Sequence, residues 1–156
     1  MRATASKTNK TNKATTGLVT AREVMNALLR AMKNKHYDYQ LNHRDAIKAL
    51  TENTRRQFTW VAKDLYIASE MMPKIQALIE LFSKTVVSGD GLHTLRNELN
   101  DIIRIKMDKL LCPGNVRVRS TCEVSQMAST WEYESELILV EEIKKAIQEI
   151  DIFINQ

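Results

Sequence analysis

The stretch YESELILVEEIKKAIQEIDIFI, residues 133–154, decides the fold class. Its apolar side chains return every three or four residues, which places them on one face of an α-helix. This seam consists of Tyr133, Leu137, Val140, Ile143, Ile147, Ile150 and Ile154. Ser129 and Glu132 form a capping-box pattern just before it, so a helix is predicted from about 129 to 154.

Two uses of this seam are open at the level of sequence. A helix in a bundle needs an apolar face for its own core. The same face could form a coiled coil with other chains, and Ile at both seam positions favours trimers or tetramers in parallel arrangements. The residues predicted for self-association are Leu137, Val140, Ile143, Ile147, Ile150 and Ile154.

Upstream, the same periodicity predicts further helices. Thr20 and Glu23 form a capping box that starts a helix over about 21–35. A second helix is predicted over 42–72, although the weak helix formers of TENT, 51–54, could split it in two. Its heptad seam would be Ile47, Leu50, Phe58, Val61, Leu65, Ala68 and Met72.

Breakers divide the rest of the chain. Pro73 is expected to open a new helix or to kink the old one, and SGDG, 88–91, to end the third. A fourth helix over about 92–110 should stop at CPG, 112–114. With four Gly and two Pro in 156 residues, turns are few. The predicted fold is an all-α bundle of about five helices with coiled-coil-like seams, forming a single domain over 18–156.

The segment NVRVRSTCEV, 115–124, departs from the helical pattern. Its apolar residues alternate with polar ones, which is the period of a β-strand. A lone strand has no partner in a helical chain. The segment is therefore interpreted as an irregular crossing loop or, as the alternative, as an edge strand that pairs with another chain.

Charge is distributed unevenly. Residues 1–17, which include KTNKTNK at 7–13, carry four basic residues and no acid, and they are predicted to be a disordered basic tail. Residues 18–122 hold 17 basic and 11 acidic residues, or +6, whereas 123–156 hold 2 and 8, or −6. A chain polarised in this way can attract copies of itself or close on itself.

The basic tail suits contact with phosphates, because lysines neutralise them and Asn and Thr add hydrogen bonds. A solubilising tail and a targeting segment are the alternatives. The residues predicted to contact nucleic acid or an acidic partner are Arg2, Lys7, Lys10 and Lys13 in the tail and Arg55, Arg56, Arg117 and Arg119 on the body.

The chain lacks the common catalytic motifs. It contains no GxGxxG, GxxxxGK[ST], GxSxG or HExxH sequence, and its three histidines are interpreted as surface or loop residues. EYESE, 132–136, is interpreted as a solvated face or an acidic patch at a helix N-terminus, because the Glu-x-x-His pairs of a bundle metal site are missing. No catalytic residue, metal or cofactor is therefore expected, and the protein is predicted not to be an enzyme.

Trp60 lies one position off the predicted seam. Wrapping around the core is one interpretation of this residue. An exposed Trp at helical spacing would instead be a candidate anchor for a partner protein.

These features favour a non-enzymatic helical assembly subunit that self-associates or joins a multiprotein complex, with a basic arm that contacts nucleic acid or an acidic partner. Its partners would be further copies of the chain or other helical proteins. The alternative is a nucleic-acid-binding regulator that dimerises through its C-terminal helix. No apolar run approaches the ~18 residues of a membrane span, so an intracellular location, cytoplasmic or nuclear, or one within a virus particle is expected.

Overall fold

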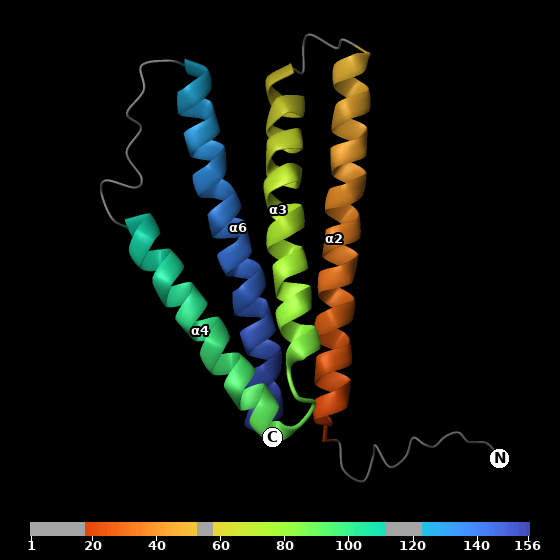
Figure 1. Cartoon of the computed structure of the whole chain (residues 1–156), viewed down its shortest axis with the longest axis vertical. Helices are drawn as coiled ribbons and strands as arrows, with labels where there is room; N and C mark the ends of the chain where they lie inside the picture. Colours follow the sequence, from red (N-terminus) through yellow and green to blue (C-terminus); the bar gives the residue numbers. More distant parts are fainter. Residues whose placement is uncertain (1–17, 53–57, 112–122) are drawn as a thin grey trace, which may run out of the picture.

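The computed structural model describes residues 18–52, 58–111 and 123–156, and these ranges contain helices and no strand. The helices are α2 (Ala21–Thr51), α3 (Phe58–Lys84), α4 (Gly89–Leu111) and α6 (Glu123–Ile154). Successive helices run in opposite directions, so α6 is parallel to α3 (Figure 1). The predicted all-α class is confirmed, but the described residues form four helices instead of about five.

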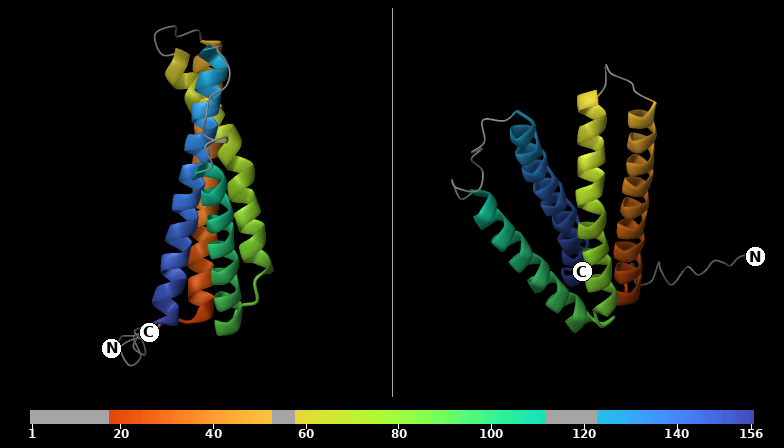
Figure 2. Two further views of the ribbon diagram at one scale, coloured as in Figure 1. Left: turned by 90° about the vertical axis from the view of Figure 1, so that its left-hand side faces the viewer. Right: turned by 45° about the horizontal axis from the view of Figure 1, so that its top comes forward.

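The helices are gathered at one end and spread at the other. The two views of Figure 2 agree that α2 and α3 lie side by side, and α6 packs against both of them and against α4. At the packed end, α2 and α4 begin and α3 and α6 finish (Figure 1). At the opposite open end, α4 has diverged from the other helices (Figure 2).

The hydrophobic core follows this arrangement. The largest fully buried apolar side chains are Met25, Met71, Ile75, Phe82, Leu92, Leu95, Leu99, Val140, Ile143 and Ile150. Toward the open end, the buried residues are mostly small, as at Ala46, Val61, Ala68 and Ser135. Because stabilisation rises with the apolar area removed from water, the packed end contributes most of it.

Helix α2 begins as predicted and ends later. The Thr20 hydroxyl accepts a hydrogen bond from the Glu23 backbone N–H at 3.1 Å, and the Glu23 carboxylate accepts one from the Thr20 N–H at 2.9 Å. The predicted end near residue 35 is wrong, because the helix continues to Thr51. Residues 21–51 contain neither Gly nor Pro, and packing along α3 supports the extra turns.

Of the two predictions for 42–72, the continuous helix is wrong and the split at TENT is confirmed. Helix α2 ends in TENT, where the Thr51 hydroxyl donates to the carbonyl of Lys48 at 2.8 Å, and α3 begins at Phe58. Such a hydroxyl bond competes with the helical ladder. The predicted seam is therefore divided between two antiparallel helices.

Of the two predictions for Pro73, the opening of a new helix is wrong, and SGDG does not end the third helix, which stops at Lys84. Pro73 lies inside α3, where Met71 and Ile75 on either side are fully buried and hold the helix in place. SGDG belongs to the start of α4, because the Ser88 hydroxyl accepts a hydrogen bond from the Gly91 N–H at 3.0 Å. A Ser in this position caps a helix N-terminus, so the segment opens the fourth helix.

The last helix begins earlier than predicted, at Glu123 instead of near Ser129. No Gly or Pro interrupts residues 123–129, so nothing in the chain resists the additional turns. The end of the valine-arginine segment is thus helical. Its remaining residues up to 122, and the choice there between loop and strand, lie outside the described residues.

The two ends of the described chain meet at the packed end. The Gln156 side chain accepts a hydrogen bond from the Val19 N–H at 2.8 Å and donates one to the Val19 carbonyl at 2.7 Å. The described chain therefore begins beside the end of α6.

Candidate interaction surfaces

Four acidic side chains of α6 form ion pairs with the other three helices. The nitrogen–oxygen distances are 3.6 Å for Lys35–Glu142, 3.0 Å for Lys63–Glu134, 3.2 Å for Lys74–Glu136 and 2.7 Å for Lys106–Glu136, and Arg96 pairs with Asp151. Of the two uses expected for the charge asymmetry, the structure thus contains the intramolecular one: acidic side chains of the last helix pair with basic side chains of the three helices around it.

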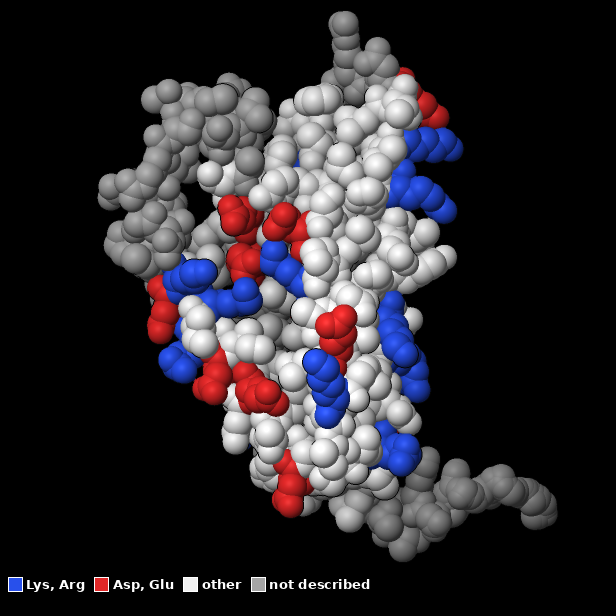
Figure 3. Space-filling model, viewed as in Figure 1, with Lys and Arg blue, Asp and Glu red and all other residues white. Residues whose placement is uncertain are grey.

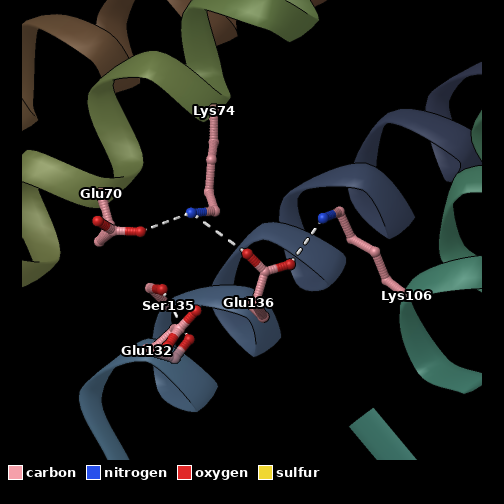
Figure 4. A network of polar contacts seen from close by, with 6 residues as sticks. All are labelled: Glu70, Lys74, Lys106, Glu132, Ser135 and Glu136. Carbon is pink, nitrogen blue, oxygen red and sulfur yellow. Dashed lines mark hydrogen bonds and ion pairs between the residues drawn. The ribbon is translucent and has the colours of Figure 1, made fainter. Parts of the chain in front are cut away.

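Glu136 is the centre of this network (Figure 4). Lys74 lies between Glu70 and Glu136, and Lys106 approaches Glu136 from α4. Burial alone would raise the pKa of Glu136, but hydrogen bonds from Lys106 and Lys74 outweigh it and hold that pKa below its ordinary value of 4.5. The prediction that EYESE is a solvated acidic face is therefore wrong for Glu134 and Glu136, which bind lysines of neighbouring helices.

Lys74 responds in the opposite sense. Its burial favours the neutral amine, but the hydrogen bonds to Glu70 and Glu136 favour the ammonium and raise the pKa of Lys74 above 10.5. Both members of the pair are thus held in their charged forms at neutral pH.

We expect the Glu136 network to make the fold sensitive to acid. Because the folded-state pKa of Glu136 is lowered, its contribution to stability is complete above pH 4.5 and is lost as pH falls through the folded value. Glu136→Gln should cost about 1–3 kcal/mol at pH 7, since Lys106 loses its carboxylate partner and Lys74 keeps only that of Glu70. Chemical denaturation followed by circular dichroism between about pH 7 and pH 3 measures both effects.

The matched control is Glu141→Gln on the same helix. Its carboxylate is 65% exposed and, among the described residues, pairs only with Lys144, three residues along. Exposed pairs of this kind contribute about 0–1 kcal/mol. Stability of the Glu136 variant should depend less on acid than that of the wild type. If the Glu136 variant and the wild type lost stability in parallel as pH falls, Glu136 would not be the titrating group.

The predicted self-association seam lies largely inside the chain. Val140, Ile143 and Ile150 are at most 2% exposed. Ile147 and Ile154 are half-buried and pack against the core, and Leu137 is half-buried. The interpretation of the seam as the chain's own core therefore accounts for its central residues.

Aromatic side chains are exposed at the open end. Trp60 is 72% exposed and Phe58 is 63% exposed, both in the first turn of α3. By contrast, Trp131 of α6 contacts Tyr66 of α3, with ring centroids 5.8 Å apart. Of the two interpretations of Trp60, wrapping around the core is excluded by its exposure. Its role as an anchor stays a prediction.

Trp60 also borders a shallow cavity of about 230 Å³ between α2, α3 and α6. The cavity is lined by Tyr39, Asn42, Trp60, Lys63, Asp64, Ile67, Ala68 and Glu134. Two of its charged side chains, Lys63 and Glu134, form an ion pair with each other. Burial and the nearby carboxylates of Glu142 and Asp38 raise the pKa of Tyr39, so its hydroxyl stays protonated.

All eight residues predicted to contact nucleic acid or an acidic partner lie outside the described residues: Arg2, Lys7, Lys10, Lys13, Arg55, Arg56, Arg117 and Arg119. The described chain contains a different basic surface, on the outer face of α2. We name Arg22, Arg30, Lys33, Arg44 and Lys48 the α2 stripe, and each of them is exposed. Figure 3 shows Lys and Arg side chains recurring down the edge of the molecule formed by α2.

Sequence reasoning missed this surface, although its signal is present. The stripe residues share one helical face only if a single helix spans 21–51, and the predicted helix ended near 35. Once that helix is known, their spacing by 8, 3, 11 and 4 residues reveals the stripe.

Other kinds of site find no support in the described part of the chain. Residues 18–52, 58–111 and 123–156 include no group of three or more His, Cys, Asp or Glu suited to a metal ion. Within the same ranges, no helix combines the length and apolar character needed to cross a bilayer. No protein-family model, no curated protein and no solved structure matches the chain.

Proposed function

We propose that the protein is a non-enzymatic helical assembly subunit that self-associates through its open end and contacts nucleic acid through basic residues. The exposure of Trp60, at 72%, carries the assembly part of the proposal. Large aromatic side chains dominate the energy of many protein interfaces and are seldom left in water without a partner.

The distribution of buried side chains also indicates that the interface lies at the open end of the bundle. The open end buries mostly small side chains, whereas Ile47, Phe58 and Trp60 near it are between 45% and 72% exposed. A second copy that covers these side chains would supply the apolar contacts that the monomer lacks there. Because Val140, Ile143 and Ile150 already serve the core, we place self-association at the open end and not on the α6 seam.

Absolute mass in solution tests the proposal. Light scattering on a sizing column should give a species larger than the 17.9 kDa monomer. The double variant Phe58→Ser/Trp60→Ser should weaken self-association by on the order of 30-fold, because an interface hot spot contributes about 2 kcal/mol or more. Dilution series of both proteins compare the two dissociation constants.

The matched control is Ile105→Ser/Ile152→Ser, which removes two side chains that are 55% and 61% exposed elsewhere on the bundle. It should leave the mass unchanged. A wild-type protein that stays at 17.9 kDa at all concentrations, or equal losses in the two double variants, would contradict assembly through the open end.

A further inference from the structure

The α2 stripe carries charge that the described chain leaves largely uncompensated. Arg22, Arg30, Lys33 and Lys48 form no ion pair with any residue in the described ranges, and Arg44 pairs only with its exposed neighbour Asp45 at 3.3 Å. Four acidic side chains of α6, Glu134, Glu136, Glu142 and Asp151, are engaged by lysines and an arginine of the other helices and not by the stripe. The pairing that closes the bundle thus leaves its positive charge on the outer face of α2.

The stripe is narrow and long. At about 100° per residue, its five members fall within an arc of about 80° on α2, and from Arg22 to Lys48 it extends about 39 Å along the helix axis. The buried residues Met25, Leu28 and Met32 lie on the opposite side of the same helix. The acidic residues of α2 fall outside the arc, so the stripe contains no negative charge.

From this geometry we infer that the α2 stripe binds nucleic acid through its phosphates. A duplex carries one charge per ~1.7 Å of its axis, so a length equal to that of the stripe contains on the order of 20 phosphates, of which those on the near side can be contacted. Arginine also binds phosphate oxygens in a bidentate manner. The inference rests on the nucleic-acid contact of the proposed function and assigns it a surface on the folded body.

The other side chains on the stripe favour nucleic acid over a membrane. Asn26, Tyr37 and Gln40 fall within the same arc, and Tyr37 is 58% exposed. Amides and hydroxyls add hydrogen bonds to phosphate and sugar oxygens. A helix that lies on a lipid surface needs an apolar face toward the acyl chains, whereas the apolar face of α2 is buried in the core.

Fluorescence anisotropy with a labelled, mixed-sequence DNA duplex tests the inference. The stripe variant is Arg30→Gln/Lys33→Gln/Arg44→Gln. The matched control is Lys84→Gln/Arg104→Gln/Lys144→Gln, which removes three exposed positive charges from other helices. We expect the stripe variant to bind at least about tenfold more weakly near physiological salt, with the log–log salt slope reduced by roughly 0.9 for each phosphate that the variant no longer neutralises. The control should bind nearly as well as the wild type.

Each alternative outcome overturns the inference. Equal losses in the two triple variants would mean that only net charge matters. Failure of the wild type to bind the duplex at about 50 mM salt, or binding only to phosphatidylserine vesicles, would remove nucleic acid as the partner. Loss of binding on deletion of residues 1–17, with no loss in the stripe variant, would assign the contact to the tail alone.

Two measurements distinguish a loss of DNA binding in the stripe variant from a loss of folding or of self-association. The thermal unfolding of the stripe variant should match that of the wild type, because its side chains are exposed. Its mass without DNA should also be unchanged. If the wild-type protein did not self-associate, the assembly proposal would fail. The inference about the α2 stripe would still be tested by DNA binding.

Discussion

Ile143→Ala should destabilise the protein by about 2–5 kcal/mol, the range for large-to-small changes at buried aliphatic residues. Ile143 is 0% exposed and belongs to the cluster that joins all four helices. The substitution removes apolar contacts and leaves a cavity that the surrounding helices fill only in part. Since domains are stable by only about 5–15 kcal/mol, the loss should be plain in urea denaturation followed by circular dichroism.

The matched control is Ile152→Ala on the same helix. Ile152 is 61% exposed, so the same chemical change should cost less than about 0.5 kcal/mol. The pair also tests the alternative use of the α6 seam. If Ile143→Ala lowered the mass in solution while the free energy of unfolding stayed constant, the residue would belong to an interface between chains and not to the core.

The helical class follows from features that lie close together in the sequence. The Thr20–Glu23 capping box is satisfied by neighbours three residues apart, and it appears in the structure as predicted. The seam of the last helix likewise requires only local periodicity. Capping boxes and apolar periodicity can be recognised from the sequence because each depends on residues within a single helix.

The predicted helix boundaries failed where tertiary contacts decide them. Helix α2 continues past its predicted end near residue 35 because α3 packs along it, and Pro73 is accommodated because its neighbours are buried. Neither contact can be read from a window of sequence. The weak helix formers at 51–54 indicated a break, but only the packing of α2 on α3 turns the chain into a hairpin there.

The interaction surfaces were predictable to a smaller extent. Periodicity identified the apolar face of α6 and the position of Trp60 outside the seam, but exposure depends on what packs nearby. The acidic run of α6 gave no sign of its partners, since Lys35, Lys74 and Lys106 come from three different helices. The α2 stripe required the full length of α2. In each case, the sequence did not show which helix packs alongside the residues concerned.

Gly91→Ala should destabilise the first turn of α4, where the chain enters this helix from α3. A β-carbon on Gly91 would overlap the Val86 carbonyl oxygen and lie 2.8 Å from the Val86 carbonyl carbon, well inside contact distance. Both are backbone atoms, so the clash cannot be relieved by a side-chain rotation. Either the segment around Val86 or the start of α4 must shift.

A shift of α4 would reach the core, because Leu92 and Leu95 follow Gly91 closely and are both 0% exposed. Overpacking of this kind typically costs about 1–3 kcal/mol. For a domain of this size, each kcal/mol lowers the melting temperature by roughly 2–4 °C. We therefore expect Gly91→Ala to melt several degrees below the wild type in a thermal scan.

Gly89→Ala is the matched control in the same turn, since a β-carbon at Gly89 would meet nothing within 4 Å. Replacing Gly at an unstrained helical position restricts the unfolded chain and stabilises by about 0.4–1 kcal/mol. The two variants should thus move the melting temperature in opposite directions, although the chemical change is identical. If both were neutral, the close approach of Gly91 to Val86 would not exist in solution, and the capped start of α4 would need a different geometry.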